Sequence, residues 1–366
     1  MNDTIQSNEI NHYITTDNMC QNLGGIDTFK NINIPQGKVR SFQKDDILLS
    51  NIRLYFRKVY RAKQKGGCSS DVLVFRAKHI DSATLFAILS SQIFTDYACS
   101  GSQGSKMPRG NKTHMMDFKI PTINFTIAKI FNSIQNKIEN NHKINELLHK
   151  ILELLYEQYF VRFDFLDENN KPYQTSGGKM KFSKELNRLI PSGWSVRFLN
   201  HKIVSTYQPK TISKTLLNDS YSYSVYGGGG IIGRFTEYNH EQSEFIISCR
   251  GQCGISYLTL PKSWITGNAM VIRPTKSYTS KTYLYHTINK YKLTNYITGS
   301  VQPQITRQNL STMPILIPKR KTLNKWNNIS SLLWNLIHNN MQSTQTLTAL
   351  RDFLLPLLLK QQVKPQ

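Results

Sequence analysis

The stretch Asp46-Ile47-Leu48-Leu49-Ser50 decides how this chain is organised, because Glu244-Phe245-Ile246-Ile247-Ser248 repeats its pattern in the second half of the chain. Further matches follow in the same order at one nearly constant offset: Val74-Phe75-Arg76 with Val271-Ile272-Arg273, Tyr97 and Gly101-Ser102 with Tyr296 and Gly299-Ser300, and Ile120-Pro121 with Ile317-Pro318. So long a period excludes a solenoid of short repeats. We therefore expect two copies of one domain.

Each copy follows the same plan, in which strand-like alternation with Gly and Ser turns precedes a long helical pattern. In the first copy an aliphatic seam with one stammer is predicted, at Ile127, Phe131, Ile134, Ile138, Ile144, Leu148, Ile151 and Leu155. In the second copy the stripe continues through Ile329, Leu333, Leu336, Leu347, Leu350 and Leu354, and Pro356 is expected to break the last turn. Two stripes at equivalent places favour helices that pack on each other over helices that each pack on their own domain.

The composition indicates a polyanionic partner. Lys and Arg total 46 against 23 Asp and Glu, a formal charge of +23 over 366 residues, which favours nucleic acid over an anionic membrane. No apolar run reaches the ~20 residues of a membrane-spanning helix, and the polar N-terminus has no hydrophobic signal core, so a cytoplasmic location is expected. Cys249 and Cys253 form a lone pair without a second pair, which favours free thiols over a zinc site.

Several motifs resemble one known family. They are the linker FDFLDENNKPYQTSGGKMKF (163–182), Ile190-Pro191-Ser192-Gly193-Trp194 at the start of the second copy, YGGGGIIGR (226–234), SKMPRGNK (105–112) and LRDFLLP (350–356). With the duplication, they make the chain similar over nearly its whole length to the specificity subunits of type I restriction–modification systems.

The resemblance implies an α/β (α+β) fold with two tandem target-recognition domains, each followed by a long helix, and the two helices packed antiparallel with pseudo-two-fold symmetry. The expected parts are a first recognition domain (1–121), a central helix (122–163), a linker (164–189), a second recognition domain (190–318) and a C-terminal helix (319–366). The counterpart of Ile190 to Trp194 would precede Met1, so the first domain is expected to be short by about its opening strand. Either the start is misassigned or the allele is recombined or trimmed.

The resemblance also implies the function and the partners. Each recognition domain would read one half of a bipartite sequence in double-stranded DNA, and the helices would set the spacer and dock two modification (methyltransferase) subunits. Restriction (motor–nuclease) subunits are an optional further partner. S-adenosylmethionine, ATP and Mg would be held by those subunits, and no cofactor or metal by this chain.

Sites for catalysis are not found in the sequence. An adenine methyltransferase needs an Asn/Asp-Pro-Pro-Tyr/Phe loop for the flipped base, and the nearest approach, Asn170-Lys171-Pro172-Tyr173, has lysine at the second position. The glycine run 227–230 is not part of a phosphate-binding loop, so a turn that approaches DNA is the better interpretation. The alternatives are a stand-alone DNA methyltransferase, another basic DNA-binding protein, a structural repeat protein or an RNA-binding module.

Candidate DNA-contact residues combine cations for phosphates with planar groups for base edges. Arg53, Tyr55 and Arg57 alternate, so we expect them to share one face of a strand; a solvated charged face is the alternative for this basic cluster. The other candidates in the first copy are Lys58, Arg61, Lys106, Arg109 and Asn111. In the second copy Arg250 and Gln252 are preferred, because Arg pairs with guanine and Gln with adenine; the others are Tyr226, Arg234, Gln302, Gln304 and Arg307.

Overall fold

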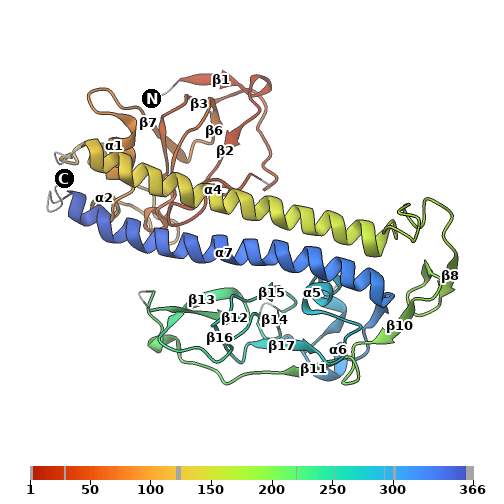
Figure 1. Cartoon of the computed structure of the whole chain (residues 1–366). Helices are drawn as coiled ribbons and strands as arrows, with labels where there is room; N and C mark the ends of the chain where they lie inside the picture. Colours follow the sequence, from red (N-terminus) through yellow and green to blue (C-terminus); the bar gives the residue numbers. More distant parts are fainter. Residues whose placement is uncertain are drawn as a thin grey trace. The chain divides into compact units, whose positions relative to one another are not determined.

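The computed structural model describes residues 3–28, 30–120, 125–219, 221–251, 253–291, 293–299 and 302–359. The chain forms two compact units, residues 1–144 with 340–366 and residues 145–339 (Figure 1). The helices α4 (Phe125–Tyr156) and α7 (Arg320–Leu359) each contribute one part to either unit. Each unit therefore contains one recognition domain and a segment of both helices. No helix in the described part of the chain is long and apolar enough to cross a membrane.

The first unit is built on an antiparallel sheet. Its strand order is β5 (Val59–Arg61), β4 (Ile47–Ser50), β7 (Val72–Phe75). The core around β4 contains apolar side chains of both helices, Phe131 of α4 and Leu355 of α7. The remaining elements are a sheet of β1 (Thr4–Gln6), β3 (Lys38–Phe42), β6 (Gly66–Cys68) and β2 (Tyr13–Ile14), and the helices α1 (Ser82–Leu89), α2 (Gln92–Ser100) and α3 (Lys112–Met116).

The second unit has a larger central sheet. Its strand order is β11 (Val204–Tyr207), β17 (Ala269–Pro274), β14 (Phe245–Ser248), β15 (Ser256–Leu258), and α5 (Lys281–Lys290) contacts it. A second sheet has the order β13 (Gly230–Phe235), β12 (Tyr223–Gly227), β16 (Trp264–Ile265). Three further strand pairs are β10 (Ser195–Phe198) with β20 (Pro314–Ile317), β18 (Ile297–Thr298) with β19 (Gln304–Ile305), and β8 (Met180–Ser183) with β9 (Arg188–Pro191). The short helix α6 spans Arg307–Leu310.

The predicted duplication is confirmed by strand register. Leu48 pairs with Val74 in the first unit, and their counterparts in the repeat, Ile246 and Val271, pair with each other in the second. The same ion pair also joins these strands in both copies. Arg76 Nη2 lies 2.7 Å from Asp46 Oδ2, and Arg273 Nη2 lies 2.6 Å from Glu244 Oε1. Two matching ladders and two matching ion pairs make the recognition domains copies of one fold.

The β10–β20 pair of the second copy has no counterpart among the described residues of the first, and neither has the edge strand β11. In the second unit β10 pairs with β20 and buries Ile317, which is 8% exposed. The equivalent Ile120 is 53% exposed, and no described strand pairs with residues 117–120. That the first recognition domain is short by about its opening strand stays a prediction.

The helices pack on each other in both units, as the two stripes predicted. In the first unit Asn141 Nδ2 donates to Thr344 Oγ1 at 3.2 Å. In the second, Asn145 Nδ2 donates to the Ile337 carbonyl at 3.3 Å, and the His149 and Trp334 rings lie 5.0 Å apart. Partners on α7 descend in number as those on α4 rise, so the pairing is antiparallel.

Three details of the helix prediction are wrong. The predicted seam of α4 is misplaced, because Ile144 and Ile151 are each 44% exposed while Gln135, Asn141 and Leu152 are buried. The predicted stripe of α7 is one residue off, because Ile329, Leu336 and Leu350 are exposed while Ser330, Ile337 and Arg351 are buried. Both helices bury polar residues, which an aliphatic pattern does not predict. Helix α7 also continues through Pro356 to Leu359. A proline so close to the end of the helix removes only one backbone hydrogen bond there.

Candidate nucleic-acid interface

Residues 53–57 form a turn and not the predicted strand. Leu54–Phe56 make a single 3-10 turn, and Arg53 and Arg57 on either side have left-handed φ values of 50° and 49°. The amides of Phe56 and Arg57 close the turn on the carbonyls of Arg53 and Leu54, each at 2.9 Å. The prediction that Arg53, Tyr55 and Arg57 share one face of a strand is therefore wrong. Of the three, only Tyr55 is exposed, at 53%.

The cations after Tyr55 contact their own unit. Arg57 Nη2 donates to the Ser90 carbonyl at 2.9 Å, and burial lowers the pKa of Arg57 although Asp352 opposes that shift. The other contacts are Lys58 Nζ to Thr16 O at 2.6 Å, Arg61 Nη2 to Asp45 Oδ1 at 2.7 Å, Arg61 Nη1 to Asn132 Oδ1 at 3.0 Å and Lys63 Nζ to Asn136 Oδ1 at 2.5 Å. DNA contact by Arg57, Lys58 and Arg61 stays a prediction, and each of them has an intramolecular role.

A second loop of the first unit packs against this turn. The Arg53 amide donates to the Pro108 carbonyl at 2.9 Å, its Nη2 donates to the Lys106 carbonyl at 3.4 Å, and Ile52 forms a β-bridge with Arg109. Predicted residues that are far apart in the sequence thus meet. The exposed side chains brought together here are Tyr55, Lys106, Met107 and Arg109, and we call them the first candidate face. Asn111 instead caps α3, because its Oδ1 accepts the His114 amide at 3.2 Å.

The second unit brings two predicted groups together in the same way. Arg250 forms a β-bridge with Gln304, the Ile305 amide donates to the Cys249 carbonyl at 3.0 Å, and Cys253 Sγ donates to the Pro303 carbonyl at 3.1 Å. The exposed side chains of this region are Arg250, Gln302, Gln304 and Arg307, and we call them the second candidate face. Gln252 falls outside the described residues.

The two candidate faces are equivalent positions of the duplicated fold. Ile52 and Arg250 correspond at the offset of the repeat, and their bridge partners Arg109 and Gln304 correspond at nearly the same offset. In each copy the loop that follows the central strand meets a loop that precedes a short capped helix, α3 or α6. The faces therefore arise from the fold itself.

The glycine run forms a hairpin tip beside the second candidate face. Gly230 has a left-handed φ of 97°, and a Cβ at Gly228 would lie 3.2 Å from the Arg250 carbonyl, so the tip and the Arg250 loop lie in direct contact. Ile231 and Ile232 follow the tip and are exposed. Neither isoleucine is among the predicted contact residues, although two apolar residues beside a glycine turn are a usable signal.

Two predicted residues near the hairpin have structural contacts. Tyr226 is buried, its hydroxyl accepts the Leu260 amide at 3.1 Å, and burial raises its pKa to about 12. Arg234 Nη2 donates to the Ser222 carbonyl of the same hairpin. Contact of Tyr226 and Arg234 with DNA stays a prediction, and their intramolecular hydrogen bonds do not favour it.

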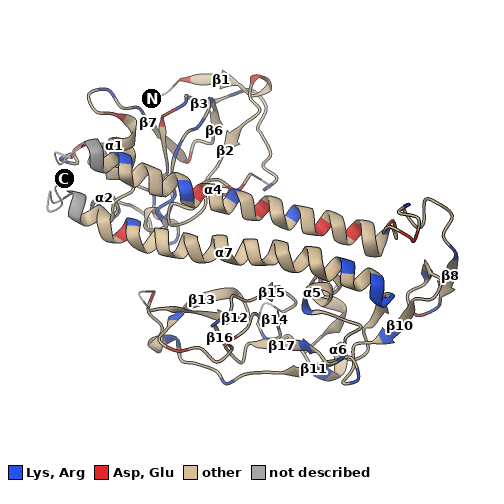
Figure 2. Cartoon of the chain, in the orientation of Figure 1, with Lys and Arg blue, Asp and Glu red and all other residues tan. Residues whose placement is uncertain are grey.

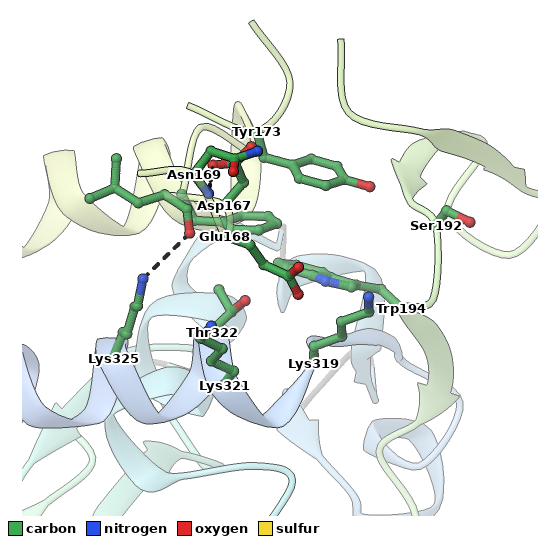
Figure 3. A pocket seen from close by; sticks show the side chains of 12 residues that line it. Asp167, Glu168, Asn169, Tyr173, Ser192, Trp194, Lys319, Lys321, Thr322 and Lys325 are labelled. Carbon is green, nitrogen blue, oxygen red and sulfur yellow. Dashed lines mark hydrogen bonds between the residues drawn. The ribbon is translucent and has the colours of Figure 1, made fainter. Parts of the chain in front are cut away.

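The linker is a packed turn of the second unit. Tyr173 stacks on Phe165 with ring centroids 4.9 Å apart, and its hydroxyl donates to the Lys179 carbonyl at 2.8 Å. The turn and the start of α7 enclose a pocket of about 270 Å³, across which Lys325 Nζ donates to the Leu166 carbonyl at 3.5 Å (Figure 3). Tyr173 thus has packing and hydrogen-bonding roles in the linker.

Charged residues occur throughout the described chain. Figure 2 shows Lys and Arg in both recognition domains, and residues of both charge signs on α4. Lys and Arg side chains suit phosphate contact, which carries affinity without sequence preference. Base reading by the two candidate faces stays a prediction.

Known proteins share both the sequence pattern and the fold. Residues 191–350 match the family model of the type I restriction modification DNA specificity domain. The type I restriction enzyme MjaIX specificity subunit of Methanocaldococcus jannaschii is 22% identical over 312 residues, which cover 75% of this chain and 67% of that protein. The crystal structure of the type I restriction–modification S subunit from M. genitalium has 15% identity and a TM-score of 0.58, covering 97% of this chain and 95% of that one.

The matched specificity domain spans the second candidate face, and the first copy repeats its fold and its face. Residues 191–350 thus match a DNA specificity domain, and the chain is similar over most of its length to the specificity subunits of type I restriction–modification systems, a family whose role is to recognise a DNA sequence.

Proposed function

We propose that this chain reads a bipartite sequence in double-stranded DNA, one half-site with each candidate face, and performs no catalysis itself. The observation that carries the proposal is the equivalence of the two faces, each built where the same two loops of the duplicated fold meet. A duplicated reader with two different sets of side chains is suited to two different half-sites. Cations elsewhere on the recognition domains would supply the phosphate contacts.

The second candidate face has the groups that distinguish bases in the major groove. An exposed guanidinium such as that of Arg250 can donate two hydrogen bonds to guanine O6 and N7, and the amide of Gln304 can pair with adenine N6 and N7. The bridge between their backbones holds the two side chains in neighbouring positions. In the first face, Lys106, Arg109 and Tyr55 are exposed, and Arg109 Nη2 lies 3.0 Å from Asp71 Oδ1.

The partners that we propose are two modification subunits, with restriction subunits as an optional addition. Support comes from an aliphatic stripe on α4 in the second unit, where Leu147, Ile151 and Leu154 are exposed at spacings of four and three residues. Glu153 and Lys150 flank the stripe, an arrangement that suits an incoming amphipathic helix. S-adenosylmethionine, ATP and Mg would be bound by those partners, and the complex would act on chromosomal DNA in the cytoplasm.

Selection from randomised DNA duplexes tests the division into two half-sites. The full chain with its modification subunits is expected to enrich a split motif. Arg250→Ala is expected to lose about 1–3 kcal/mol of base discrimination at one position of one half-site, and Arg109→Ala is expected to act only on the other half-site. Enrichment of a single uninterrupted motif, or equal loss at both halves for either variant, would contradict the proposal.

A further inference from the structure

Three consecutive backbone carbonyls of the first recognition domain point at the helix pair. Gln135 Nε2 of α4 donates to Leu23 O at 2.5 Å, and Arg351 Nη1 of α7 donates to Asn22 O at 3.4 Å. His142 Nδ1 lies 3.2 Å from Gly24 O. Arg351 also donates to Gln135 Oε1 at 2.9 Å, and both side chains are only 1% exposed. A buried arginine thus ties both helices to one loop.

That loop is in turn hydrogen-bonded to the turn that presents Tyr55. The Asn22 amide donates to the Phe56 carbonyl at 2.9 Å, and the Leu23 amide donates to the Arg57 carbonyl at 3.1 Å. The amides of residues 22 and 23 therefore hold the turn, while their carbonyls are held by the helices. An unbroken series of hydrogen bonds runs from Arg351 to the first candidate face.

The backbone at this junction adopts a conformation that needs support. Asn22, Leu23, Arg53 and Arg57 have φ values of 52°, 60°, 50° and 49°. Left-handed backbone is unfavourable for residues with side chains and persists only where the surroundings hold it. The contacts of Gln135 and Arg351 provide such a constraint. Arg57 adds another, because its Nη2 lies 3.6 Å from Asp352 Oδ1 of α7.

We propose that Arg351, acting with Gln135, is a positioning residue for the first half-site. It orders the loop 22–24, and through that loop the turn that presents Tyr55 to DNA. The inference rests on the proposed function, since it assumes that the first candidate face reads bases. Its consequence is that a residue in the C-terminal helix, beyond the second recognition domain in sequence, controls reading by the first.

The second unit supplies matched controls. Several buried positions of α7 repeat buried positions of α4 at one offset, so that Trp326 corresponds to Phe131, Ser330 to Gln135 and Arg351 to Tyr156. Ser330 Oγ lies 2.8 Å from Thr282 Oγ1, and Tyr156 Oη donates to Thr287 Oγ1 at 3.0 Å. These contacts join the helices to α5 of the second recognition domain only.

The test compares half-site preferences of full-length variants, each assembled with the modification subunits and selected on randomised duplexes. Arg351→Met keeps the length and helix propensity of the side chain but removes its donors. It is expected to erase or degrade the first half of the motif and to weaken binding to the wild-type duplex about tenfold, because buried acceptors lose a charged donor. The paired control Tyr156→Phe is expected to leave the first half unchanged.

The outcomes separate the inference from the proposed function. If the wild-type complex selects no split motif, the proposed function fails. If it does, equal loss at both halves or an unchanged first half in folded Arg351→Met overturns the inference. Gln135→Glu decides the matter should Arg351→Met fail to fold, since it keeps the acceptor for Arg351 and removes the donor to Leu23 O and to Glu139 Oε1. An unchanged first half in that variant also overturns the inference, whereas recovery of the first half by Arg351→Lys supports it.

Discussion

Acid is expected to destabilise the second unit through two buried histidines. His286 of α5 and His338 of α7 are each 8% exposed, and the Nε2 atom of each has no hydrogen-bond partner among the described residues. The His286 ring lies 5.3 Å from Trp326, and the His338 ring lies 5.8 Å from Trp334. Burial, reinforced by His149 and Lys290, lowers the pKa of His286 to about 3. Burial, reinforced by Lys281 and His149, lowers the pKa of His338 to about 4.

The sign of the effect follows from proton uptake. In the unfolded chain both rings have an ordinary pKa of about 6.5 and take up protons as the pH falls below that value. The folded rings stay neutral until about pH 4 to 3. The unfolded state therefore binds more protons between these limits, and the free energy of unfolding falls as the pH falls. At pH 5 the loss is about 2 kcal/mol for each histidine, or about 4 kcal/mol for the pair.

Urea unfolding followed by tryptophan fluorescence at pH 7.5 and pH 5 measures this loss, because Trp326 and Trp334 line the cluster. Carboxylates elsewhere also titrate, so the comparison is with the double variant His286→Gln/His338→Gln. Wild type is expected to lose about 4 kcal/mol more than the double variant on acidification. The same pH dependence in both proteins would refute the reasoning.

The other predictions concern the helices. The double variant Leu147→Glu/Ile151→Glu is expected to abolish stable association with modification subunits. The weak, salt-sensitive affinity of the isolated chain for DNA is expected to stay unchanged. Light scattering measures the association, and assembly of the variant as in wild type would reject the docking stripe. Seven residues inserted after Glu139, with seven inserted opposite in α7 after Thr346, preserve the heptad and add ~10.5 Å. The unread spacer should widen by about three base pairs, and an unchanged spacer with full methylation would reject a ruler role for the helices.

The fold was largely predictable because duplication leaves a signal that needs no tertiary knowledge. Strands β4 and β14 match residue for residue in type, and the register found in one copy recurs in the other. The seam of α4 was predicted less well, since Gln135 and Asn141 occupy buried positions that an aliphatic pattern assigns to Ile144 and Ile151. Their partners on α7 cannot be read from α4 alone.

The candidate site was predictable by residue type but not by geometry. Arg53 and Arg57 were expected on one strand face, yet their left-handed backbone depends on contacts with the distant loops 22–24 and 106–108. The partner of Arg57, Asp352, lies in the C-terminal helix. By contrast, Arg250 and Gln304 were chosen independently from sequence, and the structure brings them to adjacent positions.

The central claim, that two equivalent faces read two half-sites, is tested most directly by sequencing the methylome of cells that contain this chain and its modification subunits. A bipartite adenine-methylated motif is predicted, with a fixed unread spacer. Arg250→Ala should relax one half of that motif while the other half and the spacer stay unchanged. A continuous motif, or methylation that is indifferent to Arg250→Ala, would contradict the claim.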